Sequence, residues 1–445
     1  MRSHLSFVIC HLSFIIRHLS SVIPLLLTLT GCDFLPLTPT PTPISSLPPP
    51  TPPPSTPTPT STPQSQPLIV TLTLWVPEQF NPYGERPGAD VLAQQLADFS
   101  KIHTDLQVEV VVKKAHGRGG LLDFLRTARN AAPSVLPDLV VLDTADLEAA
   151  ADSGLIQPLD NFLSPAEISD RFPFAVALGA VEEQTMGFVV AADMQQLAYR
   201  PALLNSPPVS WTQIVSSPVP FLFPAGGRDD DQVNDATLIQ YLAADGKVTD
   251  PDGNPWLDEE VMVSVFDFYS TCISTTVISP AVVLSITDAD QSWEQFQAGE
   301  GGMAVVRAGR YWLEADEAVA AAPIPTRDGQ PLSIARGWAI AMVTDDPARQ
   351  ALARLLLNWL VAPDHNAQWT QATGYLPGTR SALRLWDISN ADRAVLHKVM
   401  EAAVPPPRPE VMATVGPAMQ DALEAVLRGR TTPKEAAAAA VESLD

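Results

Sequence analysis

Aromatic and acidic side chains stand at the ends of apolar segments early in this chain. Trp75 lies near the end of the alternating run 68–76, Glu78 follows that run, and Asp143 follows the apolar run 137–142. A flat ring can cover the apolar face of a sugar, and carboxylates accept hydrogen bonds from its hydroxyls. Parallel strands bring such side chains together at one edge of a sheet. All three are candidate ligand contacts, and the alternative for Trp75 is a place in the core.

Catalytic patterns are not found in the sequence. The histidines beyond residue 31 are His103, His116, His365 and His397, and none belongs to an H-E-x-x-H motif. There is no G-x-S-x-G elbow and no Walker A loop. We therefore predict no catalytic residues, no metal site and no cofactor.

The spacing of apolar residues predicts an α/β fold. Alternation predicts strands, and apolar positions three and four apart predict helices. In chain order the expected elements are a strand at 68–76, a helix at 89–101, a strand at 108–112, a helix at 121–131 and a strand at 137–142. This order predicts a parallel sheet with helices on both faces. Further helices are expected at 347–361 and after Thr432-Pro433-Lys434-Glu435, a capping box with proline at its first helical position.

The N-terminal region has the parts of a secretory signal. Arg17 precedes the apolar segment 22–29, which is too short to span a bilayer permanently. The run Leu29-Thr30-Gly31-Cys32 resembles the lipobox of bacterial lipoproteins. The resemblance implies that residues 1–31 are a signal peptide and that Cys32 receives lipid on its thiol. We therefore expect an extracytoplasmic protein anchored to the cell membrane by this lipid; the alternative is an ordinary signal peptide with a buried cysteine.

Residues 32–67 are predicted to form a disordered, proline-rich stalk. Proline, threonine and serine dominate this segment, and proline favours extended polyproline II over a packed core. Fully extended, the stalk would reach roughly 100 Å. Beyond it, the length suffices for two domains. The formal net charge of −23 argues against nucleic acid as a partner, and Cys272 is expected to be a buried, unpaired thiol.

Five sequence blocks between residues 136 and 377 follow one another in a familiar order. They are Pro137-Asp138 with Pro158-Leu159-Asp160, Tyr199-Arg200 with Pro207-Pro208-Val209-Ser210-Trp211, Phe296 to Met303, Gly337-Trp338-Ala339-Ile340, and Gly374-Tyr375-Leu376-Pro377. With these blocks, the chain from about residue 70 onward resembles the extracellular solute-binding proteins of ABC importers, the family that includes maltose-binding protein. Gly416-Pro417-Ala418 departs from maltose-type relatives, which place an aromatic residue there, and this argues against maltodextrin as the ligand.

The resemblance implies a type II periplasmic-binding-protein fold, with two α/β lobes joined by crossing hinge strands. Lobe I is expected to comprise residues 68–190 and 341–378, and lobe II residues 191–340 and 379–445. The crossings are expected near 188–193, 338–344 and 373–380. Such a protein captures a small-molecule ligand, here a sugar or oligosaccharide, between its lobes and presents it to an ABC permease. We expect it to act as a monomer.

The resemblance also implies further ligand-binding residues. Asp193 lies six residues before Tyr199, where sugar-binding relatives carry a ligand-contacting acid, and Tyr311 and Trp312 lie where the family has an aromatic residue in the cleft. Trp338 and Tyr375, at the second and third crossings, complete the set. Two alternatives stay open: a non-sugar solute, or a sensor without transport. A secreted enzyme would need a catalytic constellation that the sequence does not display.

Overall fold

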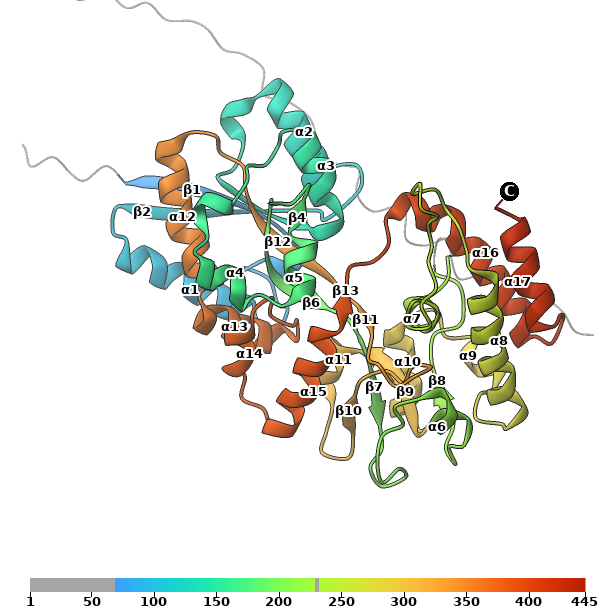
Figure 1. Cartoon of the computed structure of the whole chain (residues 1–445). Coiled ribbons are helices and arrows are strands. Elements are labelled where there is room, and N and C mark those ends of the chain that lie inside the picture. Colours follow the sequence, from blue (N-terminus) through green and yellow to red (C-terminus); the bar gives the residue numbers. More distant parts are fainter. Residues whose placement is uncertain (1–68, 229–231, 445) are drawn as a thin grey trace, which may run out of the picture. The chain divides into compact units, whose positions relative to one another are not determined.

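A five-stranded sheet forms the centre of the first lobe (Figure 1). The computed structural model of the chain describes residues 69–228 and 232–444. The strands run in the order β2 (Leu106–Lys113), β1 (Val70–Pro77), β3 (Leu139–Asp143), β12 (Arg336–Met342) and β6 (Phe188–Asp193). As predicted, β1 is parallel to β2 and β3, whereas β12 is antiparallel to both of its neighbours. The carboxyl ends of β1, β2, β3 and β6 therefore meet at one edge of the sheet, together with the start of β12.

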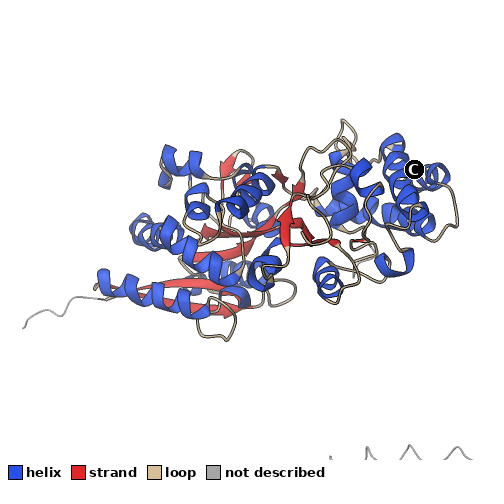
Figure 2. Ribbon diagram, turned by 90° about the horizontal axis from the view of Figure 1, so that it is seen from below, coloured by secondary structure: helices blue, strands red, loops and turns tan. Residues whose placement is uncertain are grey.

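Helices cover both faces of this sheet (Figure 2). Alternate residues of each strand enter two separate cores; in β1, Leu74 enters one and Trp75 the other. One face packs against α1 (Ala89–Ile102), α12 (Pro347–Val361) and α13 (Pro363–Thr373). The other packs against α2 (Leu121–Ala131), α3 (Leu147–Asp152), α5 (Pro173–Leu178), α14 (Arg380–Arg384) and α15 (Asn390–Glu401). Short elements complete this part: α4 (Pro165–Asp170) and the hairpin β4 (Ala180–Val181) with β5 (Gln184–Thr185).

The second lobe is built on a four-stranded mixed sheet. Its strands run in the order β10 (Ala320–Ala322), β7 (Gln195–Tyr199), β9 (Met303–Arg307) and β8 (Phe221–Leu222). A large core joins it to α6 (Trp211–Val215), α7 (Asp235–Ala243), α8 (Glu259–Ser274), α9 (Pro280–Val283), α16 (Pro409–Leu427) and α17 (Pro433–Glu442). Its opposite face packs against α10 (Ala289–Gln297) and α11 (Ala308–Glu314).

Three segments connect the two sheets. The chain passes from β6 to β7 through Met194, and from β11 (Ser333–Ile334) to β12 through Ala335. The third connection follows β13 (Ala403–Val404), which pairs in parallel with β11 before α16 begins. The first connection lies at the end of the predicted crossing at 188–193. The second lies before the predicted crossing at 338–344, and the third lies after the predicted crossing at 373–380.

These connections differ from the predicted lobe division for a physical reason. Residues 336–340 belong to β12 in the first sheet, and α14 and α15 contribute side chains to the core around α5. Residues 374–379 stay against the first lobe because Leu376 bridges to Ala192 in β6. A buried strand on either side of a hinge shows the same apolar pattern, so the sequence does not reveal which sheet it joins.

Several local predictions are confirmed. Helix α2 has the predicted bounds, and the capping box at Thr432 and Glu435 is formed. Cys272 is fully buried, and burial raises the pKa of its thiol to about 12. No helix in residues 69–228 and 232–444 is long and apolar enough to cross a membrane. The predicted signal peptide, Cys32 and the whole predicted stalk lie outside the described residues.

Candidate functional site

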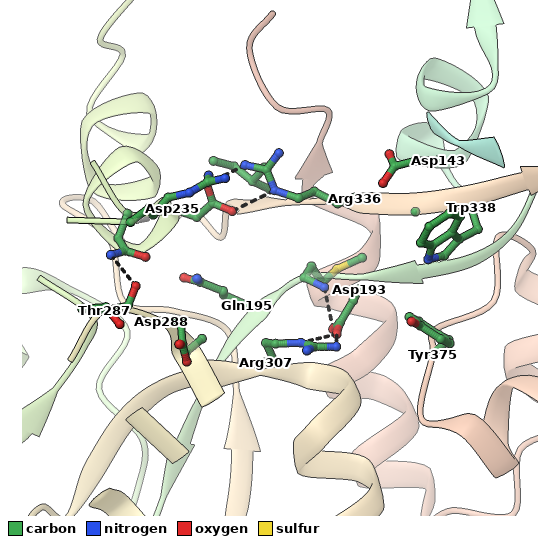
Figure 3. Close-up of a pocket in the computed structure, with 16 residues that line it drawn as sticks. Asp143, Asp193, Gln195, Asp235, Thr287, Asp288, Arg307, Arg336, Trp338 and Tyr375 are labelled. Carbon is green, nitrogen blue, oxygen red and sulfur yellow. Dashed lines mark hydrogen bonds and ion pairs between the residues drawn. The ribbon is translucent and has the colours of Figure 1, made fainter. Parts of the chain in front are cut away.

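A cavity of about 600 Å³ lies where the two sheets face each other. The first lobe contributes the ends of β3 and β6 and the start of β12, and the second contributes the start of β7, the end of β9 and the starts of α7 and α10. We call this cavity the main chamber. Figure 3 shows Trp338 and Tyr375 at one end of it and Asp235, Thr287 and Asp288 at the other. Its size is within the range of small-molecule sites.

Strand register brings the first-lobe residues of the main chamber together. In the pairing of β12 with β3, Trp338 lies opposite Asp143, and in the pairing of β12 with β6, Arg336 lies opposite Asp193. Trp338 and Arg336 are two residues apart and therefore share one face of their strand. Residues almost 200 positions apart in the chain thus line one wall.

Asp193 and Arg307 form the shortest ion pair of the chamber. Oδ2 of Asp193 accepts hydrogen bonds from Nε of Arg307 at 2.7 Å and from its Nη2 at 2.6 Å. Oδ1 accepts from the backbone N–H groups of Met194 at 2.8 Å and Gly309 at 3.0 Å. Nη1 of Arg307 also donates to Asp290 at 3.0 Å. Both Asp193 oxygens are thus occupied, and the nearby carboxylate of Asp193 raises the pKa of Arg307.

A pair of glycines permits this arrangement. A Cβ atom on Gly309 would lie 2.9 Å from Oδ2 of Asp193 and 3.0 Å from the carbonyl oxygen of Gly374. Gly374 has a φ of +77°, and a Cβ there would lie 2.5 Å from the carbonyl oxygen of Gly309. The start of α11 can therefore approach the segment before Tyr375 closely enough to donate to Asp193.

A second carboxylate-guanidinium cluster lies at the opposite end of the chamber. Oδ1 of Asp235 accepts from Nη2 of Arg336 at 2.7 Å, and its Oδ2 accepts from Nε of the same residue at 3.2 Å. Arg228 also approaches Asp235, with 3.7 Å between Nη1 and Oδ1. Nearby, Nδ2 of Asn234 donates to the carbonyl oxygen of Thr287 at 3.0 Å. This network links β12 of the first lobe to the start of α7 in the second.

Trp338 and Tyr375 provide the aromatic surface of the chamber. Trp338 is 8 % exposed; its ring meets Phe80 edge-on, with 6.1 Å between centroids, and stacks with His116 at 5.9 Å. Nε2 of His116 lies 3.4 Å from Oδ2 of Asp143, so His116 supports both the ring and the acid. Burial raises the pKa of Tyr375, which keeps its hydroxyl protonated as a hydrogen-bond donor.

One amide oxygen in the chamber has no partner. Gln195, at the start of β7, lines the chamber and is 9 % exposed. Its buried Oε1 accepts no hydrogen bond from any described residue. A buried acceptor without a donor costs about 1–3 kcal/mol. A ligand that donates to this oxygen would remove that cost.

A second chamber of about 440 Å³ adjoins the main one. The two share Asp193, Arg307 and Tyr375. The additional lining comes from the segment 79–87 of the first lobe, from α11 and from Thr373-Gly374. The Asp193–Arg307 pair and Tyr375 thus lie between the two adjoining chambers.

Four of the eight predicted ligand-binding residues lie in the main chamber. They are Asp143, Asp193, Trp338 and Tyr375. Their presence there fits the predicted role, although the two occupied oxygens of Asp193 suit it better to holding Arg307 than to contacting a ligand.

The other four predicted residues line neither chamber. Tyr311 is 4 % exposed and packs with Trp293 in the core beside α10. Trp312 packs between Tyr311 and Trp386, with its Nε1 buried and without a partner among the described residues. Successive helical residues point about 100° apart, so Arg310, the preceding residue of α11, faces the second chamber instead.

Trp75 and Glu78 are also outside both chambers. Trp75 is 5 % exposed, meets Phe124 edge-on and lies 4.3 Å from Nζ of Lys113. Trp75 thus belongs to the core, which was the alternative to a ligand contact that the sequence left open. Glu78 is exposed in a 3₁₀ turn, where its Oε1 accepts from Nδ2 of Asn81.

The sequence reasoning missed several residues of the main chamber. Arg307 ends the apolar run of β9, and Gln195 begins the apolar run of β7, so a polar residue at a strand end was the available signal. Arg336 begins the apolar run of β12 and carried the same signal. Asp235 begins a helix and carried none, and its pairing with Arg336 depends on the approach of two lobes. Within the described ranges, no group of three or more histidine, cysteine, aspartate or glutamate side chains is arranged to hold a metal ion.

Comparison with known proteins agrees with this architecture. Residues 94–394, more than half of the chain, match the family described as bacterial extracellular solute-binding protein. The chain belongs to this family. It is therefore an extracellular solute-binding protein and not an enzyme. No curated protein matches the sequence with significance.

Solved structures of solute-binding proteins share the fold. A cyclic alpha-maltosyl-1,6-maltose binding protein from Arthrobacter globiformis has a TM-score of 0.67 at 18 % identity, over 84 % of this chain and 98 % of that one. A family 1 protein from Alicyclobacillus acidocaldarius has a TM-score of 0.67 at 17 % identity, over 85 % and 98 %. An ABC transporter protein from Agrobacterium radiobacter, in complex with ribitol, has a TM-score of 0.57 at 22 % identity, over 85 % and 99 %.

Proposed function

We propose that this solute-binding protein captures a carbohydrate in the main chamber and presents it to an ABC permease. The observation that carries the proposal is the combination of side chains in one cavity between the lobes. Two aromatic residues, Trp338 and Tyr375, lie at one end of it, and seven charged and two amide side chains are among the other lining residues. Aromatic faces suit the C–H surface of a sugar, and the polar groups suit its hydroxyls.

The polar groups are arranged for a donor-rich ligand. Gln195 offers an unpartnered acceptor, whereas Arg307 and Arg336 are each held in place by a carboxylate. Groups fixed in this way lose little freedom when a ligand binds, which favours affinity. Sugars and sugar alcohols supply several hydroxyl donors and acceptors at once. The structural neighbours bound to ribitol and named for a cyclic maltosyl-maltose are consistent with a ligand of this class.

Closure of the two lobes would complete the site. The chamber takes its lining from both lobes, and the connections between them are short. A ligand that contacts both lobes stabilises the closed arrangement by the contacts it makes only there. Closure also removes the ligand from water, which strengthens each hydrogen bond inside.

Attachment to the membrane belongs to the same proposal. Lipid on Cys32 and an extended stalk of roughly 100 Å would keep the protein near a permease while leaving its lobes free to move. The test is fractionation of cells that express the wild type or Cys32→Ala. The wild type is expected in the membrane fraction and the variant in the soluble or secreted fraction, whereas an unchanged distribution would reject the lipid anchor.

The binding function is tested by fluorescence titration of the full chain with monosaccharides, disaccharides and sugar alcohols. We expect a saturable change in tryptophan emission with at least one of them and no conversion of the sugar. Trp338→Ala should weaken that affinity by about twofold to tenfold, since a stacking contact with an aromatic ring contributes about 0.5–1.5 kcal/mol beyond the area it buries. Trp256→Ala is the matched control, because Trp256 is 38 % exposed and lines neither chamber. Equal affinity of wild type and Trp338→Ala would reject the site.

A further inference from the structure

The second chamber is lined by one guanidinium group that has no hydrogen-bond or ion-pair partner among the described residues. Arg86 lies on the loop between β1 and α1, is exposed, and lines this chamber. It makes no hydrogen bond or ion pair with residues 69–228 or 232–444. Its loop is nevertheless ordered: the carbonyl oxygen of Arg86 accepts from the N–H of Ala89, and the side chain of Asn81 accepts from the N–H of Tyr83.

The other charges of the second chamber are already paired with one another. Asp193 and Asp290 both accept from Arg307. Glu314 accepts from Nε of Arg310 at 3.0 Å, and Glu294, just outside, lies 3.1 Å from Nη1 of the same residue. The six charged side chains that line the chamber balance in number, but Asp193 and Asp290 share Arg307, so Arg86 is the lining arginine that no carboxylate of the described residues pairs with.

Two further groups in this chamber suit a sugar beside an anion. Oε1 of Gln79 is buried and has no partner among the described residues, so it can accept from a hydroxyl. Tyr375 is shared with the main chamber and offers its hydroxyl and ring face. A sugar ring held near Tyr375 in the main chamber could thus extend a substituent past the Asp193–Arg307 pair toward Arg86.

We propose that the solute is an acidic sugar, whose anionic substituent enters the second chamber and pairs with Arg86. The inference rests on the proposed function and narrows its ligand class. Arginine binds a carboxylate through two parallel N–H donors, a geometry that a uronic acid offers. Arg310 would add a second contact with the anion when the lobes close. Its carboxylate partners Glu314 and Glu294 are 47 % and 63 % exposed, so its ion pairs with them are weak and leave the guanidinium able to bind the ligand as well.

The competing role for Arg86 is a closure contact. On closure it could pair with Glu314 across the chamber without touching the ligand. Such a contact would stabilise the closed form with every ligand, whereas an anion site favours acidic ligands alone. The two roles are therefore separated by the ratio of affinities for an acidic sugar and its neutral counterpart.

The test is calorimetric titration of the full chain with glucuronate, galacturonate, glucose, galactose and their phosphate esters at low and moderate salt. We expect at least one acidic sugar to bind about tenfold or more tightly than its neutral counterpart. Arg86→Gln should abolish this preference while leaving the affinity for the neutral sugar unchanged, and Arg86→Lys should retain part of it. Arg126→Gln, a substitution outside both chambers, should change neither affinity.

Each contrary outcome has a distinct meaning. If neutral sugars bind as tightly as acidic ones, or if Arg86→Gln weakens both equally, the inference is overturned while the proposed function stands. If no sugar binds at all, the proposed function fails and the inference fails with it. A preference for phosphate esters over uronates that Arg86→Gln removes would support the anion site and assign its anion as phosphate. Circular dichroism of each variant establishes that it is folded.

Discussion

The ion pair of Asp193 and Arg307 should couple the two lobes measurably. With charge centres at about 4 Å and an effective dielectric constant of about 20, the attraction is about 4 kcal/mol. The Arg307 side chain is 43 % exposed, so water screens the pair, and we reduce this value by half to about 2 kcal/mol. Urea unfolding of wild type, Asp193→Asn, Arg307→Gln and the double variant gives this coupling from a double-mutant cycle. A coupling below about 0.5 kcal/mol would show that the pair behaves as an ordinary surface salt bridge.

The same four proteins decide the role of Asp193 in binding. If Asp193 holds Arg307 for the ligand, Asp193→Asn weakens ligand affinity in the wild type but has no further effect in Arg307→Gln. We expect this result because both carboxylate oxygens are occupied by donors of the protein. An equal loss of affinity in both backgrounds would refute the positioning role and make Asp193 a direct ligand contact, as the sequence suggested.

Three further substitutions test the scaffold. Arg349→Met should lower the free energy of unfolding by about 3 kcal/mol in urea titrations, because it leaves the buried carboxylate of Asp138 without its charge partner; a loss below about 1 kcal/mol would contradict this. Gly374→Ala should lower the free energy of unfolding by about 3 kcal/mol, and Gly154→Ala should lower it by about 1 kcal/mol. Both glycines have positive φ, but only at Gly374 would a Cβ atom meet neighbouring atoms. Equal losses would show that these neighbouring atoms do not matter. Burial raises the pKa of Asp146, so its ionised form is destabilising above that pKa. Asp146→Asn should therefore raise the free energy of unfolding by about 0.5 kcal/mol at pH 7, and this gain should shrink as the pH falls toward the pKa that the carboxyl has in the unfolded chain. A gain that grows in acid would show that burial does not destabilise the ionised carboxylate.

Local structure was accessible from the sequence because local signals determine it. Helix α2 and the cap of α17 follow from apolar spacing and from residues within one helical turn. The family blocks added the two-lobed arrangement. The antiparallel insertion of β12 between β3 and β6 was not accessible, because its partners lie about 150–200 positions away and their apolar runs fit many registers.

Two kinds of signal in the sequence pointed to residues of the main chamber. Asp143 follows from its place at the end of a strand, and Asp193, Trp338 and Tyr375 follow from the family resemblance; all four line the main chamber. On α11 the prediction failed by one residue: it chose Tyr311 and Trp312, but the helix turns Arg310 to the second chamber and Tyr311 into the core. The phase of a short helix depends on its packing partners, which single-sequence reasoning does not supply.

The main chamber between the lobes is the proposed ligand site. A crystal structure of the protein with a sugar that binds in titration tests this placement. We predict one sugar molecule against Trp338 and Tyr375, within hydrogen-bond distance of Gln195 and Arg307, in a cavity narrowed by closure of the lobes. A sugar bound elsewhere, such as in the groove between α6 and α8, with no sugar in the main chamber, would contradict this placement of the ligand site.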